Sequence, residues 1–173
     1  MRIYEGSPRR DFEEVFRSIG AYLDRQGMRE ILLAEAPDGF IVQGLMMVSG
    51  GSRSDSMGQQ IKETLTFLDD DISQFMDDGI VRRGRQVSAP AAVQGYYEQA
   101  LRVLGRYMDE QQPRDVFLFE QDGSYVLRLL MTTQSGTRHE LSEFTKDDVE
   151  GLIAAAAADR RGDAAAKTGS ARR

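Results

Sequence analysis

One stretch of the sequence decides the fold, and it occurs twice. Residues 12–46 read FEEVFRSIGAYLDRQGMREILLAEAPDGFIVQGLM, and residues 97–131 read YEQALRVLGRYMDEQQPRDVFLFEQDGSYVLRLLM. The two stretches align without a gap at a shift of 85 residues, and 11 of the 35 positions are identical. The identical pairs are Glu13/Glu98, Arg17/Arg102, Gly20/Gly105, Tyr22/Tyr107, Asp24/Asp109, Gln26/Gln111, Arg29/Arg114, Leu33/Leu118, Glu35/Glu120, Leu45/Leu130 and Met46/Met131. Because the pattern of apolar positions is retained as well, we interpret the chain as a tandem duplication.

Within each copy the periodicity of apolar residues predicts one order of elements. A helical spacing opens each copy, and a short run rich in branched and aromatic residues follows it, as in a strand. Turn sequences with glycine then lead into a second strand, and a more polar third strand comes next. The expected strands are 31–35, 40–48 and 59–67 in the first copy, and 116–120, 125–133 and 137–144 in the second. A closing helix is expected from Leu68 and again after Thr145, where acidic residues suit the first turn.

The expected fold class is therefore α+β, with two helix–three-stranded antiparallel meander–helix units related by a pseudo-twofold axis. The helices are expected on one face of the sheets. The first unit spans residues 1–80 and the second spans 81–158, while 159–173 lacks apolar periodicity and is expected to be a disordered tail. We expect one fused domain, because about 80 residues make only a marginal core. The extra residues of the first copy fall in the Gly/Ser-rich loop 49–55.

Composition narrows the class of protein. The net charge of −6 argues against nucleic-acid binding, which usually needs a basic face. No apolar run approaches the roughly 20 residues of a membrane-spanning helix, and the N-terminus lacks the apolar stretch of a secretory signal. Without cysteine there is no thiolate ligand or nucleophile, and the cytoplasm is the expected location.

A polar stripe on the first helix of each copy has two interpretations. Glu13, Arg17, Gly20 and Asp24 are spaced by four, three and four residues, so they share one helix face, and the second copy retains all four. The structural interpretation is that the two helices cross near the glycines, with ion pairs within or between them. The functional interpretation is a charged groove that holds a ligand or peptide.

Other candidates for chemistry have ordinary explanations. His139 is the only histidine and could act as a general base, but no Ser or Asp stands at a recognisable spacing from it, which favours a strand-surface position. The acidic run 69–71 could attract a hard cation, but it lacks the alternating ligands of a calcium loop and suits a helix start. The glycines at 50–51 match no phosphate-binding motif. We expect no catalytic residue, no metal and no cofactor.

These patterns favour a non-enzymatic, acidic protein-interaction module, an adaptor or chaperone-like factor whose partner is another protein. Small acidic secretion chaperones are similar in combining helices with short antiparallel sheets, which is a likeness of fold only. A homodimer is an open alternative. The second function is small-ligand binding or weak hydrolysis at the seam between the copies, where clefts commonly form. The candidate ligand- or partner-binding residues are Arg17, Arg102, Glu35, Glu120 and His139.

Overall fold

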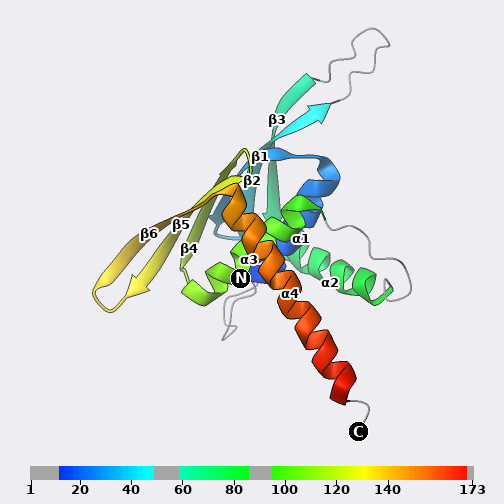
Figure 1. The fold of residues 1–173 in the computed structure, drawn as a ribbon. Helices are drawn as coiled ribbons and strands as arrows, with labels where there is room; N and C mark the ends of the chain where they lie inside the picture. Colours follow the sequence, from blue (N-terminus) through cyan, green and yellow to red (C-terminus); the bar gives the residue numbers. More distant parts are fainter. Residues whose placement is uncertain (1–11, 49–58, 86–94, 171–173) are drawn as a thin grey trace, which may run out of the picture.

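The computed structural model describes residues 12–48, 59–85 and 95–170, and within them it is an α+β fold of four helices and one six-stranded sheet (Figure 1). The predicted class is confirmed, and every predicted helix and strand within these residues is present. The helices are α1 (Phe12–Gln26), α2 (Asp69–Arg85), α3 (Tyr96–Gln111) and α4 (Lys146–Ser170). The strands are β1 (Arg29–Ala36), β2 (Gly39–Val48), β3 (Gln59–Leu68), β4 (Asp115–Gln121), β5 (Ser124–Thr133) and β6 (Gly136–Phe144).

The sheet has the order β3-β2-β1-β4-β5-β6, and all its neighbouring strands are antiparallel. Two meanders, β1-β2-β3 and β4-β5-β6, meet at their first strands, where Leu33 lies opposite Leu118. Counted inward from either edge, the sheet therefore runs from the third strand of a meander to its first strand. This junction makes one continuous sheet out of two hairpin-connected pieces.

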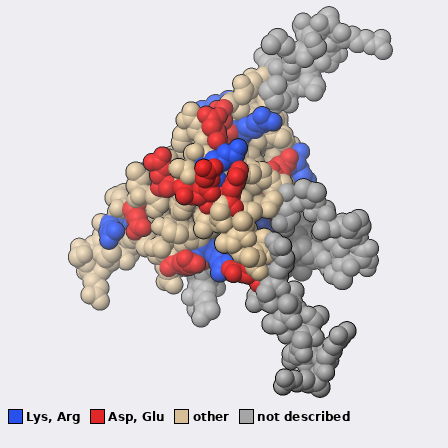
Figure 2. Space-filling view, in the orientation of Figure 1, with Lys and Arg blue, Asp and Glu red and all other residues tan. Residues whose placement is uncertain are grey.

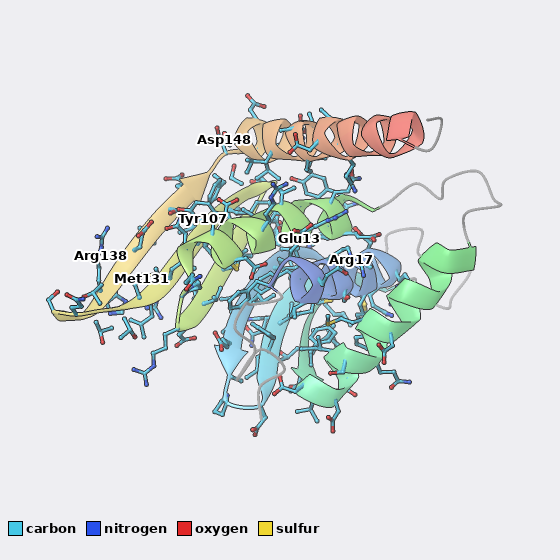
Figure 3. The ribbon with its side chains drawn as sticks, turned by 90° about the horizontal axis from the view of Figure 1, so that it is seen from below. Glu13, Arg17, Tyr107, Met131, Arg138 and Asp148 are labelled. Carbon is cyan, nitrogen blue, oxygen red and sulfur yellow. The ribbon has the colours of Figure 1, made fainter. Side chains whose placement is uncertain are left out.

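All four helices pack on one face of the sheet (Figure 3). Helices α1 and α3 lie against each other over the central strands, α2 packs beside α1, and α4 packs beside α3. Aromatic contacts join the helix layer to the two edge strands. On the outer helix α2, Phe75 meets Phe67 on β3 with ring centroids 6.2 Å apart, and the inner helix α3 reaches the other edge strand through Tyr107, which meets Phe144 on β6 at 5.2 Å.

One hydrophobic core lies between the helices and the sheet, and both halves of the chain contribute to it. Phe16 packs edge-to-face on Phe40 at 5.4 Å, and Leu101 and Leu127 are fully buried in the second half. Each such side chain contributes roughly 1.5–3 kcal/mol through its burial. The largest buried side chains therefore belong to one folding unit.

Two boundaries differ from those expected. Helix α2 runs to Arg85 and so crosses the expected unit boundary at residue 80. Helix α4 continues to Ser170, through most of the stretch expected to be a disordered tail, and its alanines explain this because Ala has the highest helix propensity. The loop 49–55 lies outside the described residues. Within the described part of the chain, no helix has the length and apolarity needed to cross a membrane.

Candidate functional site

The contact between α1 and α3 is made possible by the two retained glycines. A Cβ atom at Gly20 would lie 2.4 Å from the backbone oxygen of Tyr97, and one at Gly105 would lie 2.4 Å from that of Phe12. The inferred close approach is confirmed, with one refinement. Each glycine meets the first turn of the other helix, so the two helices exchange the same contact at both ends.

The last turn of each helix caps the first turn of the other. Asp24 accepts hydrogen bonds from the backbone N–H groups of Tyr97 and Glu98 at 3.1 and 2.8 Å. Asp109 accepts them from Phe12 and Glu13, both at 3.0 Å. These N–H groups have no partner inside their own helix, so each carboxylate satisfies two donors and meets the positive end of a helix dipole.

The two arginines of the stripe also join the helices. Arg17 donates from Nη1 to Glu98 at 3.1 Å and from Nε to Glu14 at 2.9 Å, and its side chain is 5% exposed. Arg102 donates from Nε to Glu13 at 2.8 Å. In Figure 3 the labelled Glu13 and Arg17 lie in the helix layer. The stripe is thus built into the helix pair, as in the structural interpretation.

Glu120 is a buried carboxylate that accepts hydrogen bonds from three different elements. It is 4% exposed and accepts from the backbone N–H of Ile31 at 3.0 Å, the hydroxyl of Tyr97 at 2.9 Å and the N–H of Gly123 at 2.8 Å. It therefore holds β1, α3 and the β4–β5 turn together. The register of β1 shifts just before this point, and Glu30 adopts a positive φ of 50°.

The five candidate residues named from the sequence are not brought together. Arg17 and Arg102 are in the helix layer, whereas Glu35 and Glu120 lie on the helix-covered side of β1 and β4. His139 is exposed on β6 and lies opposite Leu130, on the other side of the sheet. No group of three or more His, Asp or Glu residues in the described ranges is arranged to hold a metal ion.

A cavity of about 610 Å³ opens where α3 and α4 begin, beside the end of α1. It is lined by Asp24, Gly27, Met28, Arg29, Glu30, Tyr96, Tyr97, Glu120, Asp122, Gly123, Lys146 and Glu150. Of the five candidates only Glu120 reaches it. Figure 2 shows Asp and Glu side chains gathered on this side of the molecule, around the start of α4.

Three tyrosines stand at and behind this cavity. Burial raises the pKa of Tyr97 and of Tyr125 well above the ordinary 10.0, and the nearby charge of Glu120 raises both further. Burial also raises the pKa of Tyr96. All three phenols therefore keep their protons at physiological pH, and two of them use these protons within the protein, Tyr97 toward Glu120 and Tyr96 toward the backbone oxygen of Gly123.

None of the described helices packs on the opposite face of the sheet. Alternation along the strands places an apolar row there, because Ala34 and Leu32 on β1 lie opposite Phe117 and Phe119 on β4. The row continues outward to Ile41 on β2 and Val126 on β5. We call this set, with Leu141 on β6, the helix-free face. Phe119 and Ile41 are each 38% exposed, and Leu141 is 71% exposed.

Sequence reasoning missed both the cavity and the helix-free face. Nothing in the spacing of Glu30, Tyr96 and Glu150 indicates that they meet, because they come from three separate elements. The helix-free face could have been predicted from a pattern in the sequence. The runs Ile31–Ala34 and Val116–Phe119 are apolar at every position, whereas a strand with one face exposed should alternate.

Known proteins offer no relative from which a function could be transferred. No protein-family model matches the chain, no curated protein matches it, and no solved structure matches its fold. Function must therefore be argued from the geometry of its own surfaces.

Proposed function

We propose that this protein is a non-enzymatic protein-interaction module, adaptor or chaperone-like, that binds another protein through its helix-free face. Its halves are proposed to have arisen by tandem duplication and to be related by a pseudo-twofold axis, which the sequence identities and the symmetric strand order support. A cytoplasmic location stays a prediction.

The observation that carries the proposal is that the two central strands are apolar on both faces, while helices cover only one. Strands of this kind belong to sheets that are covered on both sides. Phe117 and Phe119 lie on the uncovered side of β4, and Leu32 lies beside them on β1. Exposed apolar area of this extent marks interaction sites in soluble proteins.

The make-up of the helix-free face suits a protein partner. Polar residues surround its apolar centre, with Thr64 and Thr66 on β3 and Glu143 on β6. The guanidinium of Arg128 lies over the ring of Phe117, 5.5 Å from its centroid. Apolar centres with polar rims, rich in aromatic residues and arginine, are typical of protein interfaces.

The size of the face is also sufficient. Six strands spaced by about 4.8 Å, each about seven residues long at about 3.3 Å per residue, give a face of roughly 650 Å², to which every second side chain of each strand points. A standard interface buries about 800 Å² on each partner. The proposed partner therefore presents an apolar surface of similar extent.

Photo-crosslinking in the native host tests the proposal. A crosslinking phenylalanine analogue would replace Phe119, and a matched copy would replace Leu152 on α4, which is also 38% exposed. We expect one protein to be linked in high yield at position 119, not at 152, and the link to be lost when Ile41→Lys is added. Equal labelling at both positions, or a link only to the chain's own residues 1–11, would contradict the proposal.

A further inference from the structure

The cavity beside α3 and α4 has the dimensions of a small-ligand site. Its volume of about 610 Å³ lies within the usual range of roughly 300–1,000 Å³ for such sites. It lies at the seam between the halves, since its walls come from α1, β1, α3, β4 and α4. Ligand binding at the seam was the second function that the sequence allowed. The residues at this site now indicate which class of ligand would fit.

The charge of the lining favours a cation. Five carboxylates line the cavity, whereas Arg29 and Lys146 are the only basic side chains in its lining. Asp24 and Glu120 already accept hydrogen bonds from the protein. The exposed carboxylates of Glu30, Asp122 and Glu150 form no hydrogen bond or ion pair with a side chain in the described part of the protein, so these three carboxylates can face a ligand.

An aromatic wall adds a second element of recognition. Tyr96 is 37% exposed, and its ring packs edge-on against that of Tyr97 at 5.8 Å. The Tyr96 hydroxyl donates to the backbone oxygen of Gly123 at 3.3 Å, which holds the ring at the edge of the cavity. An ammonium ion is attracted to the face of such a ring within about 6 Å of its centre.

The hydrogen bonds of Glu120 also fix the position of Glu30. The chain reaches a positive φ of 50° at this residue, and the next N–H group is held by Glu120. The corresponding residue of the second half, Asp115, pairs regularly with Leu130. Within the described strands the positive φ of Glu30 therefore has no counterpart at Asp115, and the two carboxylates are held differently.

We propose that this cavity binds a primary ammonium group, with Glu30, Asp122 and Glu150 around the charge and Tyr96 against it. Two sources carry that chemistry, namely a free polyamine and the side chain of a lysine in a peptide. Because these carboxylates are exposed and water screens their charges, we expect weak binding that salt reduces.

Calorimetric titration of the full chain at low salt tests this, with spermidine and with a lysine blocked at both backbone ends as the two probes. We expect saturable binding of one or both, weakened about fivefold by Glu30→Gln with Glu150→Gln. Tyr96→Leu is expected to weaken it about threefold. Asp70→Asn with Asp77→Asn removes the same charge from exposed sites on α2, outside both the cavity and the helix-free face, so it serves as the matched control and should bind as the unaltered chain does.

The outcomes separate clearly. Binding of spermidine alone assigns the site to free polyamines, and binding of the blocked lysine alone assigns it to a peptide side chain. Absence of saturable binding, or equal weakening by the control pair, would overturn the proposal. Circular dichroism of each variant establishes that it is folded. The helix-free face takes no part in this test, so its failure leaves the proposed protein-binding function untouched.

Discussion

Asp24, in the last turn of α1, caps α3 through Tyr97, which is 73 residues away in the sequence, with a hydrogen bond of 3.1 Å between Oδ1 and the backbone nitrogen. Asp109 does the same for α1 through Phe12 at 3.0 Å. Helix α3 has a glycine, Gly95, as its own N-cap residue, which supplies no side-chain cap. The stability of each half therefore depends directly on the other.

Asp24→Ala and Asp109→Ala should each lower the free energy of unfolding by about 1–2 kcal/mol, because each leaves two N–H groups of a helix start without their acceptor. Urea unfolding measures this. Asp70→Ala, at an exposed site on α2, should change stability by less than about 0.5 kcal/mol. Equal effects at all three positions would show that the caps do not matter.

Gly20→Ala and Gly105→Ala should destabilise the fold by several kcal/mol, about 3 in our expectation, because the added methyl group must push two backbones apart. Leucine at both positions should be worse still. Gly151→Ala in α4 is the matched control, since nothing lies within 4 Å of its Cβ position. The control should gain up to about 1 kcal/mol from helix propensity alone. If the melting temperature fell equally in the Gly20, Gly105 and Gly151 variants, the close approach of the two helices would be contradicted.

Glu120→Gln should cost roughly 3 kcal/mol, because an amide can accept hydrogen bonds at only one end and turns donors toward groups that themselves donate. Ile31, Tyr97 and Gly123 supply those groups. Hydrogen exchange at the amides of Ile31 and Gly123 should accelerate more than exchange elsewhere. Glu143→Gln, on the exposed side of β6, is the control and should leave both stability and exchange unchanged. A Glu120→Gln variant with unchanged stability and exchange would show that the three hydrogen bonds of Glu120 do not stabilise the fold.

Stability should fall steeply above pH 10, because burial raises the pKa of Tyr125 above its ordinary 10.0. The folded state then holds a proton that the unfolded chain releases, so the contribution is fully present below pH 10 and is lost as the pH rises beyond it. The loss from one such tyrosine is about 1.4 kcal/mol per pH unit.

Tyr125→Phe should remove part of this alkaline loss while changing stability at pH 8 by less than about 1 kcal/mol. The aligned position in the first half is Phe40, which shows that a phenyl ring is accepted there. Urea midpoints at pH 8 and pH 11 give the comparison. Tyr22→Phe, which removes a partly exposed phenol, serves as the control, and identical alkaline profiles for both variants would contradict the prediction.

Local patterns in the sequence were sufficient for the elements and for the contact between the two helices. Alternation and helical spacing are properties of neighbouring residues, so the six strands followed from them, and two glycines at costly mid-helix positions indicated a close approach. The aspartate caps were not predicted, because the groups that Asp24 and Asp109 satisfy are on the partner helix. The cavity was missed for the same reason, as Glu30 and Tyr96 meet only after the halves have joined.

Exchange of caps between the halves also sets an order of events during synthesis. Helix α1 is complete at Gln26, but its cap at Asp109 is made 83 residues later and its sheet neighbour β4 is complete 95 residues later, which takes roughly 4–20 s at usual translation rates. Throughout that interval the first half exposes an open edge of β1 and an unsatisfied helix start. Because an open strand edge can pair with another chain, we expect the second half to act as a competitor on the same chain, which covers β1 before a neighbouring product does.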